Sequence, residues 1–206
     1  MKKVVIINGS PRKKGNSSLL ATALKEGISD SPLGQVRVDI YSPATHAFAP
    51  CIGCERCCKT GECIQSDDMT HLVDALEVAD MLIWVSPLYF GGVPSQMKAI
   101  IDRFQLLWAR NIAAGELKGI RSNRFRPALA FYISAKDDPF ATKTKRTAAL
   151  LPLKYASNTA GFTLEDDKKH RRAIVGPSKP GDIAFAPHSA SLGDLVHLAL
   201  ERIWDI

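Results

Sequence analysis

The sequence predicts an α/β protein built on a doubly wound parallel sheet of five strands. Two short apolar runs, residues 4–7 (VVII) and 81–85 (MLIWV), are typical of strands buried on both faces. Amphipathic helical segments alternate with the strands along the chain, which is the pattern of an open sheet covered by helices. The 206 residues fit a single domain over residues 1–206, large enough to bury about 70% of its unfolded surface.

The five strands are expected at residues 4–7, 35–41, 81–85, 127–133 and 161–164. The second strand alternates, with Val36, Val38 and Ile40 on one face and polar side chains on the other. One of its faces is therefore expected to contact water, as in a strand near the sheet edge. Residues 166–180 are polar and carry no clear periodicity.

Helices are expected between the strands, each with one apolar stripe. The stripe of the first helix is Leu19, Leu20, Ala23, Leu24 and Ile28, and that of the last is Leu192, Leu195, Val196, Ala199, Leu200 and Ile203. Asp67 and Asp68 are placed to cap another helix.

Two further helices contain prolines. One helix is expected from Pro94 through Trp108, with the proline in its first turn. Another is expected over residues 142–157, with Pro152 as a candidate break. The tryptophans of the chain are expected in the core because they lie on a buried strand or on apolar stripes.

The formal net charge is +6, and basic residues gather at 118–126, 143–146 and 168–172. These clusters are either solvated faces or a docking surface for an anionic partner such as NADPH or an acidic redox protein. No basic motif interleaved with aromatics occurs, so nucleic acid is not expected as a partner. No apolar run approaches the roughly 18 residues of a membrane span, and the N-terminal run is too short for a signal peptide. We therefore expect no membrane association and a cytoplasmic location.

The stretch KVVIINGSPRKKGNSS, residues 3–18, joins the first strand to the first helix. A loop of this kind directs helix N–H groups and the positive end of the helix dipole at one point, which favours a phosphate. Neither G-x-G-x-x-G nor the Walker motif is present. A loop rich in hydroxyls and amides suits a terminal monophosphate, such as that of FMN; an ordinary polar turn is the alternative. The candidate phosphate ligands are Ser10, Arg12, Asn16, Ser17 and Ser18.

The loops after strands one, three and four are expected to converge, because ligands of open parallel sheets bind at the carboxyl ends of the strands. The second of these loops contains Pro87, Leu88, Tyr89, Phe90, Gly91 and Gly92. Its aromatics offer apolar or stacking surface, and its glycines allow a ligand to approach the backbone closely. The alternative is that both aromatics pack into the core. The third loop, residues 134–138, begins at Ser134.

All five cysteines lie in the irregular segment 42–66. Cys51, Cys54, Cys57 and Cys63 have the spacing C-x2-C-x2-C-x5-C, and Cys58 is a fifth thiol. Iron–sulfur clusters use such compact runs. Zinc fits less well because its two pairs are normally separated by a longer spacer, and structural disulfides are disfavoured in the cytoplasm. A redox disulfide or a loop of thiols without metal remains an alternative.

Two motifs carry a resemblance to a known family. Asn8-Gly-Ser-Pro-Arg with Gly15-Asn-Ser, and Ser86-Pro-Leu-Tyr-Phe-Gly-Gly-Val-Pro-Ser-Gln-Met-Lys-Ala-Ile-Ile-Asp-Arg, resemble the NADPH-dependent FMN reductase family of flavodoxin-like proteins. The resemblance implies a flavodoxin-like fold in which the first loop binds the FMN phosphate. It implies that residues 87–92 line the isoalloxazine ring, with Ser134 as a further candidate contact. The third loop lacks the glycines often found in the family.

The cysteine spacing is similar to that of the iron–sulfur flavoproteins, a branch of the same group. That resemblance implies a [4Fe–4S] cluster on Cys51, Cys54, Cys57 and Cys63, close to the FMN. It also implies a homodimer or a tetramer.

The sequence is thus interpreted as an FMN-binding electron-transfer oxidoreductase that takes electrons from a ferredoxin-like donor. One alternative is an NAD(P)H-dependent FMN or quinone reductase without a cluster. A flavodoxin-like carrier and a thiol-based sensor are further alternatives. No hydrolytic triad or pair of catalytic carboxylates is recognised, so no catalytic side chain is assigned.

Overall fold

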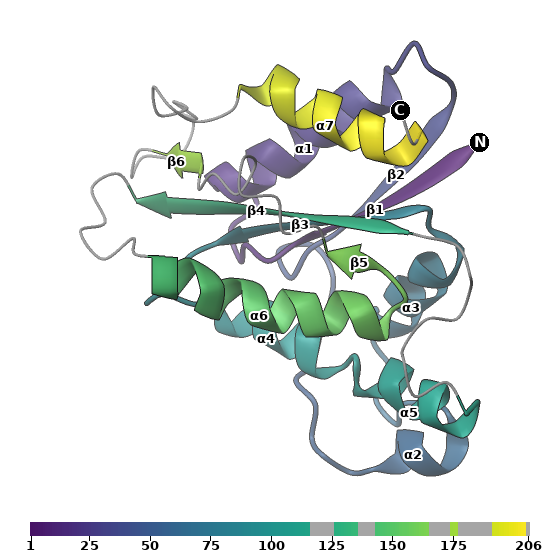
Figure 1. The fold of residues 1–206 in the computed structure, drawn as a ribbon. Coiled ribbons are helices and arrows are strands. Elements are labelled where there is room, and N and C mark those ends of the chain that lie inside the picture. The colour runs from purple at the N-terminus through teal and green to yellow at the C-terminus, as the bar shows by residue number, and fades with distance from the viewer. Residues whose placement is uncertain (116–125, 136–142, 165–173, 177–190, 205–206) are drawn as a thin grey trace.

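A computed structural model describes residues 1–115, 126–135, 143–164, 174–176 and 191–204. Its centre is a parallel sheet in the order β2-β1-β3-β4-β5 (Figure 1). The strands are β1 (Lys2–Asn8), β2 (Val36–Tyr41), β3 (Met81–Pro87), β4 (Pro127–Ala135) and β5 (Thr163–Leu164). The order reverses between β1 and β3, because β2 is added on one side of β1 and β3 on the other. The predicted doubly wound, flavodoxin-like sheet is confirmed.

A short sixth strand, β6 (Ile174–Gly176), also pairs with β4. β5 pairs with the beginning of β4 and β6 with its end, both on the edge that β3 does not occupy. The two short strands therefore share the fifth position of the sheet. β6 lies in the segment 166–180, where the sequence showed no strand pattern, and its three residues are too few to produce one.

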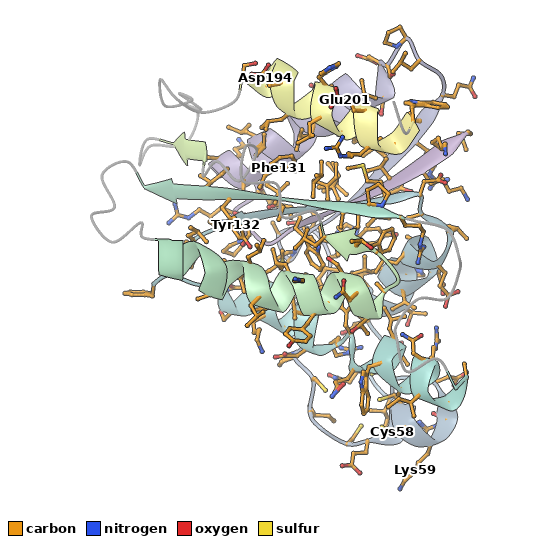
Figure 2. The ribbon with its side chains drawn as sticks, viewed as in Figure 1. Cys58, Lys59, Phe131, Tyr132, Asp194 and Glu201 are labelled. Atoms are coloured by element: carbon orange, nitrogen blue, oxygen red, sulfur yellow. The ribbon has the colours of Figure 1, made fainter. Side chains whose placement is uncertain are left out.

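Helices cover both faces of the sheet (Figure 1). On one face lie α1 (Asn16–Ser29) and α7 (Leu192–Trp204), and on the other α3 (Met69–Val78), α4 (Ser95–Asp102) and α6 (Lys143–Thr159). The central strands are buried on both faces and feed two apolar cores with alternate side chains. Figure 2 shows this alternation at Phe131 and Tyr132, which leave β4 toward opposite helix layers.

Two small helices lie beyond α4, away from the sheet. They are α5 (Gln105–Ala113) and α2 (Arg56–Thr60), and they pack against each other (Figure 1). None of the helices within the described ranges is both long and apolar enough to cross a membrane.

Several helix expectations need correction. The helix expected from Pro94 through Trp108 is two helices, because the chain bends at Arg103 and Phe104. α6 continues through Pro152, which the sequence offered as a break. In α1 the buried stripe includes Ser17 and Ala21, whereas Leu19 is exposed.

The tryptophans also differ from one another. Trp84 is fully buried, and its indole N–H donates to Ser157 Oγ at 2.8 Å. Trp108, which was expected in the core, is 48% exposed, because α5 buries the neighbouring side chains of Leu106, Leu107 and Ala109 instead.

Candidate functional site

Three predicted loops leave the sheet at the same edge. Asn8 at the end of β1 pairs with Val85 of β3, and Pro87 at the end of β3 pairs with Ile133 of β4. The loops after β1, β3 and β4 therefore begin side by side, across the point where the strand order reverses. This is the place where ligands bind in open α/β sheets.

The first loop is organised by Asn8, which the sequence analysis did not single out. Its Oδ1 accepts the N–H of Ser10 at 3.1 Å, and its Nδ2 donates to Ser18 Oγ at 3.0 Å and to Ser42 Oγ at 3.4 Å. Ser42 Oγ in turn donates to the carbonyl of Ser10 at 3.3 Å. The sequence did contain a signal for this role: Asn8 is a polar amide directly after an apolar strand. The structure shows it buried, and a buried amide needs hydrogen-bond partners.

The candidate phosphate ligands surround the start of α1. Gly15 is the N-cap residue and supplies no side-chain cap. Ser18 Oγ donates to the carbonyl of Arg12 at 2.6 Å, and the N–H of Gly15 donates to the same oxygen at 3.2 Å. Ser10 and Ser17 are each 3% exposed, whereas Arg12 is exposed. Hydrogen bonds within the loop thus hold it curled next to the N-terminus of α1. Because that N-terminus has no side-chain cap, its N–H groups are favourably placed to bind an anion.

The second loop is a tight turn at the end of β3. Tyr89 and Gly92 exchange two backbone hydrogen bonds of 3.0 Å. The two residues between them, Phe90 and Gly91, have φ angles of 50° and 77°, as in a type I′ turn. Tyr89 is 41% exposed and Phe90 is fully exposed, so neither aromatic packs into the core. A left-handed conformation is unfavourable for phenylalanine, and such strain is often found at functional turns.

The remaining predicted ring residues lie close by in the chain. Leu88 extends the pairing of β3, because its N–H donates to the carbonyl of Ile133 at 2.9 Å. Ser134 belongs to β4 and pairs with Val175 of β6. The rest of the third loop, residues 136–138, lies outside the described residues.

The cysteine segment starts at this edge, at Ser42, and then runs down to α2. One small pocket is lined by four of the cysteines, Cys51, Cys54, Cys57 and Cys63, together with Arg103, Gln105 and Leu106. Cys58 does not line it; it is exposed on α2, at the outer end of the molecule (Figure 2). The fifth cysteine is therefore outside the lining of the pocket, although it adjoins Cys57. The pocket lies beneath α5 and not at the strand ends.

The geometry around the thiols is that of an open loop. Within the parts of the chain that are described, no group of three or more metal-binding side chains is placed around a single ion. The residue types still fit an iron–sulfur cluster, because each iron of a cluster takes its own thiolate. Burial, with a smaller contribution from Cys58, raises the pKa of the Cys57 thiol, so metal binding there would have to displace a proton.

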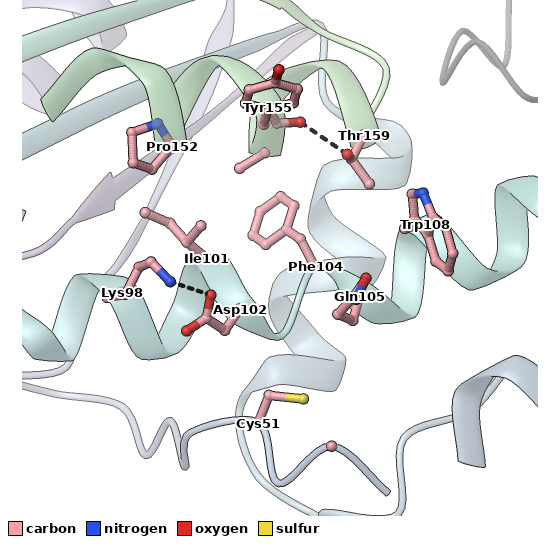
Figure 3. Close-up of a pocket in the computed structure, with 12 residues that line it drawn as sticks. Cys51, Lys98, Ile101, Asp102, Phe104, Gln105, Trp108, Pro152, Tyr155 and Thr159 are labelled. Atoms are coloured by element: carbon pink, nitrogen blue, oxygen red, sulfur yellow. Dashed lines mark hydrogen bonds and ion pairs between the residues drawn. The ribbon is translucent and has the colours of Figure 1, made fainter. Parts of the chain in front are cut away.

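A second pocket of about 520 Å³ opens beside Cys51 (Figure 3). Its floor and walls come from α4, α5 and α6, and Trp108 and Tyr155 form exposed aromatic parts of its rim. Lys98 and Asp102 form an ion pair of 2.6 Å on one side. None of the residues predicted from the sequence for flavin binding lines this pocket.

Comparison with protein families gives one clear match. The family model described as NADPH-dependent FMN reductase matches residues 2–138. This range includes the first two loops and all of the cysteines.

Curated relatives and solved structures agree with this match. An iron–sulfur flavoprotein of Methanocaldococcus jannaschii is 38% identical over 49% of this chain and 51% of its own length. One of Archaeoglobus fulgidus is 44% identical over 49% of this chain and 44% of its own. The chain spans about half the length of the curated relatives it matches. The NAD(P)H:quinone oxidoreductase from Methanothermobacter marburgensis has the same fold, with a TM-score of 0.58 over 98% of this chain and 96% of that one, at 15% identity.

Proposed function

The chain belongs to the NADPH-dependent FMN reductase family, and from this premise we propose that it is an electron-transfer oxidoreductase that carries FMN and a [4Fe–4S] cluster. The name shared by its curated relatives supports the cluster. We propose further that residues 1–206 form one FMN-binding domain, with the cysteine-rich loop at 42–66 as its second redox site. When bound, the two groups supply the electron chemistry, and the chain holds, orients and shields them.

The FMN phosphate is assigned to the first loop. Ser10, Asn16, Ser17 and Ser18 offer neutral donors at the start of α1, and Arg12 is an exposed cation in the same loop. The isoalloxazine ring is assigned to Pro87, Leu88, Tyr89, Phe90, Gly91 and Gly92, with Ser134 beside them. Phe90 supports this assignment in two ways. Its left-handed backbone is unfavourable, as is often seen at functional sites, and its fully exposed ring is available to contact a bound ligand.

The cluster is assigned to Cys51, Cys54, Cys57 and Cys63. The single observation that carries this assignment is their common pocket, from which the adjacent Cys58 is excluded. Spacing alone left the zinc and thiol-loop alternatives open. A pocket lined by all four of these cysteines supports a shared centre, because the four ligands of a cluster must converge on one place.

Direct reduction by NAD(P)H is the second candidate function, and the family description favours it. In that case the cysteine loop holds no metal and the flavin accepts electrons from a nicotinamide at the strand ends. A flavodoxin-like carrier without a small-molecule donor is the third candidate.

One preparation decides among these functions. Protein purified without oxygen is analysed for released flavin by mass, for iron and acid-labile sulfide, and by its visible spectrum. FMN with about four irons per chain, and reduction by a ferredoxin-like donor but not by NADPH, supports the proposal. Rapid bleaching of the flavin by NADPH without iron supports the reductase, and recovery of FAD or of no flavin rejects both.

Assembly into a homodimer or tetramer is part of the proposal. Exposed aromatics support it, because Phe90, Trp108 and Tyr155 leave apolar surface open to water. A cytoplasmic location is supported by the cysteines, all of which are free thiols. A monomeric mass by light scattering at micromolar concentration would reject the assembly.

A further inference from the structure

Arg103 is a buried cation that the assignment above leaves without a role. It lies at the bend between α4 and α5, and its side chain is 2% exposed. A buried charge is costly unless it is paired and its donors are satisfied. The hydrogen-bond partners of Arg103 therefore indicate the role of this buried charge.

One edge of the guanidinium closes the base of the cysteine loop. Nη1 and Nη2 donate to the two carboxylate oxygens of Asp67 at 2.8 and 3.1 Å, and Nη1 also donates to the carbonyl of Ala49 at 2.9 Å. Asp67 Oδ2 accepts the N–H of Ala49 at 2.9 Å. Ala49 lies just before Cys51 and Asp67 just after Cys63, so this network joins the entry and the exit of the loop.

The other edge carries a donor that the protein leaves unused. Nε–H of Arg103 is buried and has no hydrogen-bond partner among the described residues. Arg103 lines the same small pocket as Cys51, Cys54, Cys57 and Cys63. Burial tends to lower the pKa of Arg103, but the hydrogen bonds and charge of Asp67, joined by the nearby Cys63 sulfur, raise it. A permanent positive charge with a spare N–H donor thus lines the pocket of the four cysteines, and Cys63 is near enough to act on it.

We propose that Arg103 tunes the cluster by donating its Nε–H toward the Cys63 sulfur, which makes the bound cluster easier to reduce. The inference rests on the function proposed above. A bound cluster would gain one electron and one negative charge from the dithionite of the titration, while Arg103 would keep its proton. A fixed positive charge and a hydrogen bond to sulfur both stabilise the more negative state, and hydrogen bonds to sulfur are a recognised determinant of cluster potential.

The test compares three variants by redox titration of the reconstituted cluster with dithionite, followed by electron paramagnetic resonance. Arg103→Gln removes the positive charge. Arg103→Lys keeps the charge but loses the planar guanidinium with its several N–H donors. Arg110→Gln is the matched control. Arg110 also holds the cysteine segment, through Gly61 O at 2.8 Å, and it pairs with Glu77, but it does not line the thiol pocket.

We expect Arg103→Gln to lower the ratio of reduced to oxidised cluster at a fixed potential at least tenfold, which is about 59 mV for a one-electron couple. Arg103→Lys should show a smaller shift in the same direction, and Arg110→Gln none. The midpoint potential does not depend on how many protein molecules hold a cluster. It can therefore be measured even if the variants bind less iron.

Three outcomes would overturn the inference. The Arg103 variants could titrate at the potential of the unmodified protein, Arg110→Gln could shift as far as Arg103→Gln, or folded Arg103 variants could hold no cluster at all, which would make the role purely structural. If the unmodified protein itself takes up no iron and sulfide, the proposed function fails and the inference fails with it.

Discussion

The guanidinium carbon of Arg126 lies 4.0 Å from the ring centroid of Phe162, so the cation is stacked on the aromatic face. From this position Arg126 donates to the carbonyls of Leu76, Ala79, Ala160 and Gly161, at the ends of α3 and α6. Its sequence neighbourhood suggested one member of a basic cluster. Its contacts make it a structural link between two helices and β4.

Arg126→Lys should therefore destabilise the protein by about 2–3 kcal/mol, because one ammonium cannot serve all of these carbonyls. Urea unfolding measures the loss as a lower midpoint with an unchanged slope. Arg37→Lys is the control: its pair with Asp39 is exposed, and the change should stay within about 0.5 kcal/mol. Equal midpoints for the two variants would contradict the structural role.

Acid should weaken the fold through Asp67. Burial raises the pKa of Asp67, but the hydrogen bonds from Arg103, Ala49 and Met69 bring it below its ordinary value of 3.8. A carboxylate with a depressed pKa contributes stability above its unfolded pKa and loses it as the pH falls through the folded pKa. The stability difference between the unmodified protein and Asp67→Asn should thus be largest near neutral pH and shrink below about pH 4. Urea unfolding across this range, with exposed Asp39→Asn as the comparison, measures it; a difference that is constant with pH would refute it.

Ser18 should matter for flavin affinity even if it never contacts the phosphate. Its hydroxyl accepts from Asn8 and donates to the carbonyl of Arg12, so it holds the curl of the first loop. Ser18→Ala should weaken FMN binding by about 1–2 kcal/mol. Quenching of FMN fluorescence by the apoprotein gives the affinity. Thr22→Ala removes an exposed hydroxyl from the same helix and should leave it unchanged.

Removal of one cysteine at a time tests the separation of the fifth thiol. Cys58→Ala should keep about four irons per chain after anaerobic reconstitution, since Cys58 lies outside the thiol pocket. Cys63→Ala should lose most of them, because it removes a wall of that pocket. Iron and sulfide analysis of both variants is the measurement, and equal iron in the two would show that the ligand assignment is wrong.

Replacement of Phe90 should raise the stability of the apoprotein but weaken FMN binding or self-association. Phe90→Asn places an Asn-Gly pair in the type I′ turn, where that pair is strongly favoured, and should stabilise the apoprotein by about 0.5–1 kcal/mol. It should also weaken FMN binding or self-association, because the exposed ring is lost. Unfolding and light scattering follow the two effects, and a loss of apoprotein stability would contradict the strain.

The sheet could be predicted because its strands are short, buried on both faces and separated by helical periodicity. The bend at Arg103 could not, since the apolar stripe of residues 94–108 continues across it. The bend places Arg103 against Asp67, 36 positions earlier in the chain, and a pair so distant in sequence leaves no local pattern. Similarly, α6 continues through Pro152 because its packing against β4, β5, α4 and α5 stabilises the helix.

At the candidate site, sequence spacing led to the four thiols that share a pocket and to the two loops at the sheet edge. It missed Asn8 and Arg103, whose roles depend on partners distant in sequence. It also left Tyr89 and Phe90 undecided between core and surface, because a turn of two residues has no periodicity to read.

The network that ties Ala49, Asp67 and Arg103 together makes residues 49–67 a closed ring. Closing a flexible segment of this length has an entropic cost on the order of 2–3 kcal/mol. In this chain the entropy of the segment is lost when the protein folds, independently of metal binding. The backbone on which the cysteines lie is therefore closed at its base whether or not a metal is bound. Removal of the proposed cluster should leave this closure intact and allow the cluster to be reconstituted.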